Sequence, residues 1–184
     1  MVGVISKVNV LYIAILIGIS LGAQPIMGFN YGAKKFDRVK EATLINMRAV
    51  TIISIITFAI FQLFPLQIIR IFGTGTPEYE EFAIRYIRIF MFMIPLNGAQ
   101  PAASFLFTAI GKPVKGLIIS LSRHIIFFLP AIFILPGYFG IEGVLFTGPV
   151  ADLLAAIVAF SLYMIEIKKL KSLIGDENEL ISTN

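Results

Sequence analysis

Five long apolar runs are the feature that most limits how this chain can fold. They cover residues 8–28, 47–69, 82–111, 117–137 and 143–165. Each is close to or beyond the roughly 20 residues that an α-helix needs to cross the hydrocarbon of a bilayer. The run at 47–69 is rich in β-branched residues, but its length without turn signals favours a membrane helix over a strand. The sequence therefore predicts an all-α, polytopic membrane protein with five transmembrane helices and a frayed polar tail over residues 172–184.

The composition excludes most soluble functions. Only 14% of the residues are charged, whereas a soluble domain has about 25%. The chain has no Cys and one His, so it offers neither thiolate nor histidine clusters for a metal. It lacks a phosphate-binding Gly-x-x-x-x-Gly-Lys-Ser/Thr motif, and Gly73-Thr74-Gly75 has no third glycine for a dinucleotide. We therefore expect no enzyme and no cofactor, and uphill transport would have to use an ion gradient.

The positive charges lie in short clusters between the apolar runs, as topology signals do, and this argues against a nucleic-acid partner. One side of the predicted bundle collects the connections 29–46 and 112–116 and the C-terminus, with the cations Lys34, Lys35, Arg38, Lys40, Lys112, Lys115, Lys168, Lys169 and Lys171. The positive-inside rule places this side, and the C-terminus, in the cytoplasm of a cell whose plasma (inner) membrane holds the chain. An odd number of spans that starts outside is typical of a fragment. Cleavage of a signal peptide near Ser20-Leu21-Gly22 is the alternative interpretation of the N-terminus.

The third run carries the most polar side chains. Asn97, Gln100, Ser104 and Thr108 recur at helical spacing and share one face, while Pro95 and Pro101 interrupt the helix. Polar groups in hydrocarbon need partners or water, so this face should look inward. We predict that these four residues, with Gln24 of the first run, line a substrate cavity. Simple hydrogen bonding between helices is the alternative.

Three ionisable residues lie within the last two runs, where an unpaired charge costs several kcal/mol. Arg123 and Asp152 have opposite charges in neighbouring runs, so we predict a structural ion pair between them, with a coupling role for Asp152 as the alternative. His124 can titrate near neutral pH, but a histidine hydrogen-bonded between helices is the expectation. Together the three are candidates for a buried polar network.

The stretch 22–40 (GAQPIMGFNYGAKKFDRVK) combines small residues, a proline and a basic end. Two pairs of glycines let another backbone approach one helix face, and they are Gly18 with Gly22 and Gly28 with Gly32. Pro25 removes a helical N–H, so we expect a kink or a loosened turn there. A short interfacial helix could follow in the basic connection.

The same stretch resembles the signature of the second lobe of the multidrug and toxic compound extrusion (MATE) transporters. The resemblance is carried by Gln24-Pro25-Ile26-x-Gly28-Phe29-Asn30-Tyr31-Gly32-Ala33-Lys34 with Arg38-Val39. It continues at Phe107-x-Ala109-x-Gly111-Lys112, at Ser122-Arg123-His124, and at Gly143-Val144 with Pro149 and Asp152. Thr108 and His124 stand where the family commonly has glutamine.

The resemblance implies helices eight to twelve of a twelve-helix transporter built from two lobes. It also implies alternating access and the exchange of Na⁺ or H⁺ for organic cations or drugs. The first lobe is then a missing partner, and the chain alone is expected to be inactive. In part of the family, the cation sites use carboxylates of the first, seventh or tenth helices. The run at 82–111 has no Asp or Glu, and the resemblance does not include the other two helices, so the identity and site of the coupling ion do not transfer.

Two other functions remain open from the sequence. A lipid-linked oligosaccharide flippase of related architecture would favour a cationic cavity for pyrophosphate. A non-transporting membrane scaffold would pair with another chain through its small-residue faces. The neutral amides and hydroxyls of the third run favour the drug exporter.

Overall fold

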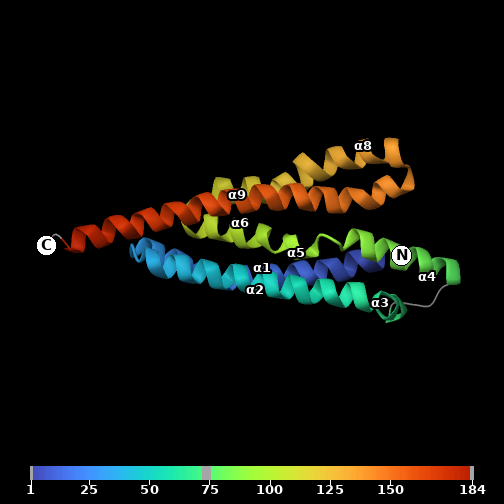
Figure 1. The fold of residues 1–184 in the computed structure, drawn as a ribbon, viewed down its shortest axis with the longest axis horizontal. Helices are drawn as coiled ribbons and strands as arrows, with labels where there is room; N and C mark the ends of the chain where they lie inside the picture. Colours follow the sequence, from blue (N-terminus) through green and yellow to red (C-terminus); the bar gives the residue numbers. More distant parts are fainter. Residues whose placement is uncertain (1, 72–75, 183–184) are drawn as a thin grey trace.

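The first apolar run forms α1 (Val2–Gly32), which lies antiparallel to α2 (Phe36–Leu63) in a helical hairpin (Figure 1). The structure is a computed structural model that describes the backbone of residues 2–71 and 76–182 and the side chains of residues 7–71, 76–140 and 142–175. Both helices are longer than predicted, and the connection between them is a tight turn in which Lys34 has a left-handed backbone (φ 58°). Phe36 therefore begins α2, and the separate interfacial helix is wrong. The helix also continues through Pro25 without a break.

One of the predicted small-residue pairs meets a neighbouring backbone. A Cβ atom on Gly28 would lie 3.2 Å from the carbonyl oxygen of Ala109 in α6, so glycine permits this close approach of two helices. Among the described atoms, none lies within 4 Å of a Cβ placed on Gly18, Gly22 or Gly32. The close approach therefore occurs at one of the four predicted positions.

The third run is a broken helix. Its pieces are α4 (Pro77–Phe90), α5 (Ile94–Asn97) and α6 (Ala99–Ala109), and the two halves are bent by 41°. The break falls at residues 91–93, just before Pro95, whereas α6 accommodates Pro101 in its first turn. Before it, α2 ends at Leu63, and a short α3 (Pro65–Ile71) follows. The predicted turn at Gly73-Thr74-Gly75 lies outside the described residues.

The fourth run changes its helical winding midway. It consists of α7 (Pro113–Leu121), the π-helical segment η1 (Ser122–Phe128) and α8 (Leu129–Phe139). Pro130 follows η1, and a proline ring clashes with the carbonyl four residues earlier in an α-helix. The wider π winding relieves that clash, and a π segment often marks a functional site.

The last run forms α9 (Ile141–Ser182), the longest helix of the structure (Figure 1). It continues well past the predicted end at residue 165, and its backbone is helical as far as Ser182, within the stretch 172–184 that the sequence predicts as a polar tail. Ile167 and Leu170 are buried beyond that end, and their packing accounts for part of the extension.

By length and composition, four helices of the described chain can cross a membrane, or five when the bent pair of α4 with α5 and α6 counts as one span. Among the described residues there is no strand. Many large apolar side chains, such as Ile55, Phe133 and Ile157, are more than half exposed. In a membrane such side chains can face lipid or further helices, and the interior is filled by two apolar clusters, of which one contains Ile87 and the other Phe107.

Candidate functional site

A cavity of about 290 Å³ opens between α1, the α5–α6 segment and the α7–η1 segment. Three of the predicted cavity residues, Asn97, Gln100 and Ser104, line it. Its remaining lining comes from Ile13, Leu16, Ile17, Pro101, Phe105, Ser120, Arg123 and His124. The wall is therefore mostly apolar, with amides, hydroxyls and two ionisable side chains concentrated on α5, α6 and η1.

Two of the predicted cavity residues lie elsewhere. Thr108 lines an adjoining, more open pocket between α6 and α7 that shares Ser104 and Ser120 with the cavity, and its hydroxyl donates to the carbonyl of Ser104 in its own helix (3.0 Å). Gln24 is half-buried on α1 and does not belong to the lining of the cavity. A helix of this length carries Thr108 and Gln24 to a different level from Asn97.

The polar face of α6 also holds α7 in place. Gln100 Nε2 donates to the carbonyl of Ile119 (3.2 Å), and Ser104 Oγ donates to the carbonyl of Gly116 (3.0 Å). A Cβ atom on Gly116 would lie 2.8 Å from the backbone oxygen of Ser104, so the two helices touch through their backbones. The two interpretations of this face, cavity wall and contact between helices, therefore apply to the same side chains.

The two opposite charges of the last two runs form an ion pair. Arg123 Nε donates to Asp152 Oδ1 at 2.5 Å, and Asn97 Nδ2 donates to Asp152 Oδ2 at 3.0 Å. Asp152 is 4% exposed, and both of its oxygens are occupied. This triad connects η1, α9 and α5 and leaves the wall of the cavity without net charge at this point.

The π-helical winding of η1 sets the direction of two successive side chains. Arg123 reaches the buried carboxylate, whereas His124 is exposed at the cavity. Among the described residues His124 has no hydrogen-bond partner, so the prediction of a histidine hydrogen-bonded between helices is wrong. Its imidazole can instead reach a molecule in the cavity.

The position of Asn97 depends on the break in the third run. Gly98, which follows it, lies so close to α2 that a Cβ atom there would be 2.9 Å from Ser54 Oγ and 3.1 Å from the carbonyl oxygen of Val50. The Tyr12 hydroxyl lies 2.8 Å from Ser54 Oγ and donates to the carbonyl of Ile94 at 3.1 Å. This contact satisfies a carbonyl at the start of α5 and ties the break to α1 and α2.

A second buried charge was missed by the sequence analysis. Glu166 of α9 is 2% exposed, and its carboxylate binds the ammonium of Lys112 and lies 3.9 Å from that of Lys115. Lys115 also lies over the ring of Phe107, 5.5 Å from its centre. Glu166 could have been suspected because it is the one carboxylate between Asp152 and the lysines of α9.

No candidate metal centre emerges from the described part of the chain, because it contains no group of three or more His, Asp or Glu side chains that could hold an ion. The acceptors near the cavity are neutral apart from Asp152. A carboxylate whose oxygens are both held by donors from Arg123 and Asn97 is a poor ligand for a cation.

Comparison with known proteins places the chain in a family. The family model MatE matches residues 1–134. The multidrug export protein MepA of Staphylococcus haemolyticus is 24% identical over 149 residues, which cover 79% of this chain and 31% of the relative. The FAD transporter of Shewanella oneidensis is 21% identical over 157 residues, which cover 85% of this chain and 34% of the relative.

The fold is similar to that of a solved transporter. A solved outward-facing multidrug resistance MATE family transporter of the MOP superfamily superposes with a TM-score of 0.83 at 22% identity, covering 92% of this chain and 38% of that one. The chain thus spans about a third of the length of the curated relatives it matches. Since the family model matches 134 of its 184 residues, the chain belongs to the MatE family.

Proposed function

We propose that this chain is the C-terminal part of a multidrug efflux transporter that exports cationic or amphipathic organic compounds in exchange for Na⁺ or H⁺ by alternating access. The observation that carries the proposal is the cavity lined by Asn97, Gln100 and Ser104. Its volume of about 290 Å³ is at the lower limit of about 300 Å³ for sites that bind drug-sized molecules. The rest of the substrate then contacts the first lobe of the transporter.

The charge balance of the wall favours cationic and amphipathic cargo. A free Arg123 would repel an organic cation, but Asp152 neutralises it. The remaining polar groups are amides, hydroxyls and the imidazole of His124, which can accept hydrogen bonds from a cation, and the α1 side of the cavity is apolar. A flippase for pyrophosphate-linked lipids needs unpaired cations, so this arrangement favours the exporter.

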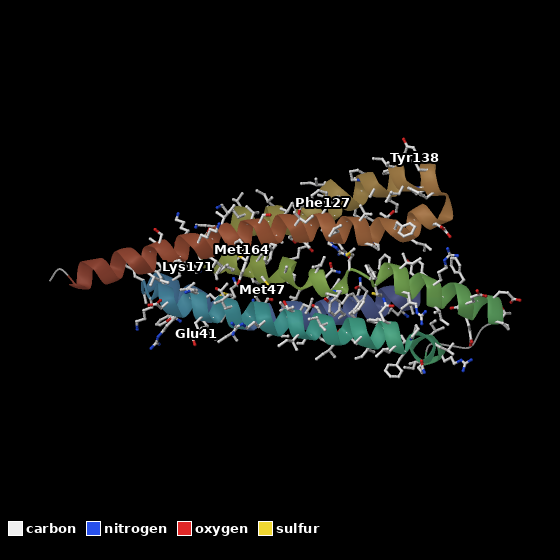
Figure 2. The ribbon with its side chains drawn as sticks, in the orientation of Figure 1. Glu41, Met47, Phe127, Tyr138, Met164 and Lys171 are labelled. Atoms are coloured by element: carbon white, nitrogen blue, oxygen red, sulfur yellow. The ribbon has the colours of Figure 1, made fainter. Side chains whose placement is uncertain are left out.

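The distribution of charge supports a cytoplasmic C-terminus in a plasma (inner) membrane. Figure 2 labels Glu41 and Lys171 near one end of the bundle and Tyr138 near the other. The turn between α1 and α2 and the lysines of α9 lie at the first of these ends. At the opposite end two of the cations have carboxylate partners, since Arg70 pairs with Glu80 (3.0 Å) and Arg85 with Glu142 (2.5 Å). The excess of positive charge therefore lies with the C-terminus.

Anionic cargo is the second candidate, because Arg123 and His124 both line the cavity and one relative is an FAD transporter. An anionic group could compete with Asp152 for the guanidinium of Arg123 and use His124 as a second donor. The two candidates predict opposite responses to the same probes.

Binding to the purified full chain in detergent separates them. Ethidium and FAD are both fluorescent, and the chain has no Trp, so the binding of each can be followed directly. We expect ethidium to bind, Gln100→Leu to weaken it about tenfold, and the matched variant Thr108→Val, outside the cavity, to leave it unchanged. Binding of FAD alone would establish the second candidate in place of the first.

Export is tested in a pump-deficient bacterial host. The chain is produced alone and together with a polypeptide that carries the other two-thirds of a MatE transporter. We expect ethidium resistance only from the pair, and loss of that resistance when both the Na⁺ and H⁺ gradients are collapsed. Binding of neither probe, with no resistance from the pair, would contradict the transport proposal and favour a scaffold.

A further inference from the structure

A second hollow, of about 530 Å³, lies between α1 and α2. It has none of its described lining residues in common with the proposed transport cavity, and it does not depend on the transport proposal. On α1 its wall is a single face that runs from Ile19 to Asn30, and on α2 it runs from Ala49 to Arg38. The hollow is therefore a groove along the seam of the hairpin, apolar along most of its length.

The polar end of the groove carries Arg38, Glu41 and Asn30. Beside it lie the turn between the helices, with Lys34 and Lys35, and the start of α2, with Asp37 and Lys40. The N-terminus of α2 is also located here, and in the described structure no side chain caps it. Basic side chains and free backbone N–H groups at a helix N-terminus both attract an anion.

A buried amide supplies a second, independent sign of a ligand. Asn46 lines the groove and is 3% exposed, yet its Oδ1 atom has no hydrogen-bond partner in the described structure. The other buried side-chain oxygen without a partner there, Ser20 Oγ, belongs to the same helix pair. Leaving a buried polar atom without a partner is unfavourable, so a ligand or water that hydrogen-bonds to it is favoured.

The spacing of these groups matches an amphiphile. Asn46 is eight residues from Arg38, or about 12 Å along a helix at 1.5 Å per residue, toward the middle of the apolar run. Beyond Asn46 the groove is lined by Ala49 and Ile19. A ligand that fills it needs an anionic head, polar linkages at intermediate depth and an apolar chain.

We propose that the α1–α2 groove binds an anionic glycerophospholipid from the leaflet at the basic end of the bundle. The phosphate lies at Arg38 and the N-terminus of α2, and the glycerol ester region lies at Asn46. The carboxamide donates from Nδ2 to an ester carbonyl and accepts at Oδ1 from a bridging water. One acyl chain continues between Ile19 and Ala49.

The groove can be probed by single tryptophans, because the natural chain has none. Ile45 lines the groove and is 57% exposed, whereas Ile52 lies on the same helix outside it and is 56% exposed. The full-length variants Ile45→Trp and Ile52→Trp are reconstituted in vesicles that contain brominated phosphatidylglycerol or brominated phosphatidylcholine. Quenching gives the relative association constant of the two lipids at each position.

We expect the anionic lipid to be favoured about fivefold at position 45, since one Lys or Arg near an anionic headgroup contributes about 1 kcal/mol. At position 52 the ratio should stay near one. In the Ile45→Trp background, Arg38→Gln should return the ratio to near one and Asn46→Leu should lower it. The control Lys169→Gln, which removes an exposed cation on α9, should leave it unchanged.

Three outcomes would overturn the proposal. They are equal ratios at positions 45 and 52, a ratio that Arg38→Gln does not change, and loss of the preference on adding inorganic phosphate, which would indicate a site for free phosphate.

Far-UV circular dichroism checks that each variant is folded. If the Arg38→Gln variant is not folded, the lipid ratio at position 45 is measured at two salt concentrations instead. Raising the salt from about 0.1 M to about 1 M shortens the Debye length from about 10 Å to about 3 Å and should lower the preference for the anionic lipid. A ratio that salt leaves unchanged would equally contradict the proposed charge contact.

Discussion

The ion pair between Arg123 and Asp152 gives the sharpest prediction about stability. Its side chains are 15% and 5% exposed, respectively, so the two ends of the pair differ in their access to water. Removing one partner of a buried pair costs about 3–5 kcal/mol, because the other charge stays buried without compensation. We expect Arg123→Gln to lie within this range, since it leaves the carboxylate of Asp152 with Asn97 alone.

The reverse substitution should cost less. Asp152→Asn leaves the guanidinium of Arg123 at the cavity, where water can hydrate it, and the new amide can still accept from Asn97. We therefore expect a loss of about 2–3 kcal/mol, below the full cost of a buried unpaired charge. The double variant carries no unpaired charge, so its loss should be well below the sum of the two single losses.

The assay is reversible unfolding of the full chain in mixed detergent micelles, followed by far-UV circular dichroism, for the parent and the three variants. A coupling energy above about 1.5 kcal/mol is within the range for residues in direct contact. Strictly additive losses, or a loss below about 0.5 kcal/mol for Arg123→Gln, would refute the assignment of a buried structural pair.

Three further substitutions test other contacts by the same unfolding assay. Gly116→Ala would place a methyl group 2.8 Å from a backbone oxygen of α6, so we expect a loss of about 1–3 kcal/mol; Gly22→Ala, in open space among the described atoms, should be neutral or stabilising, and equal effects would contradict the close approach. Glu166→Gln leaves two lysine ammonium groups without their carboxylate and should cost about 2–4 kcal/mol; an unchanged midpoint would mean that the carboxylate is hydrated. Tyr12→Phe removes the contacts to Ser54 and to the break in the third run and should cost about 1–2 kcal/mol, and a stabilised variant would count against that network.

The sequence predicts the parts of the site that follow from periodicity and charge. Helical spacing alone places Asn97, Gln100 and Ser104 on one face, and the structure brings all three to one cavity. Opposite charges in neighbouring runs likewise predict the contact of Arg123 with Asp152, because an unpaired charge in hydrocarbon is too costly. These predictions depend only on which residues a helix aligns.

Other features depend on tertiary packing and could not be predicted. Spacing also predicts Thr108 in the cavity, but it lines the adjoining pocket between α6 and α7 instead. The position of Glu166 makes a buried partner conceivable, but its contact with Lys112 in the turn between α6 and α7 depends on how the helices pack. The sequence gives no reason to expect that one of the prolines Pro25, Pro95 and Pro101 disrupts its helix more than the others. The break nevertheless lies at residues 91–93, just before Pro95. The surrounding helices decide which proline a helix tolerates.

The break at residues 91–93 also determines how motion can pass through the molecule. Continuous α-helical hydrogen bonding stops there, so α4 can change its angle to α6 without breaking helical hydrogen bonds. The hydrogen bonds from Gln100 and Ser104 meanwhile hold α6 against α7. The hydroxyl of Tyr12 on α1 donates to the carbonyl of Ile94 and so fixes the first residue after the break. A displacement of α4 would therefore be transmitted to the cavity through Asn97, the last residue of α5, while the hydrogen bonds of Gln100 and Ser104 to α7 oppose movement of α6.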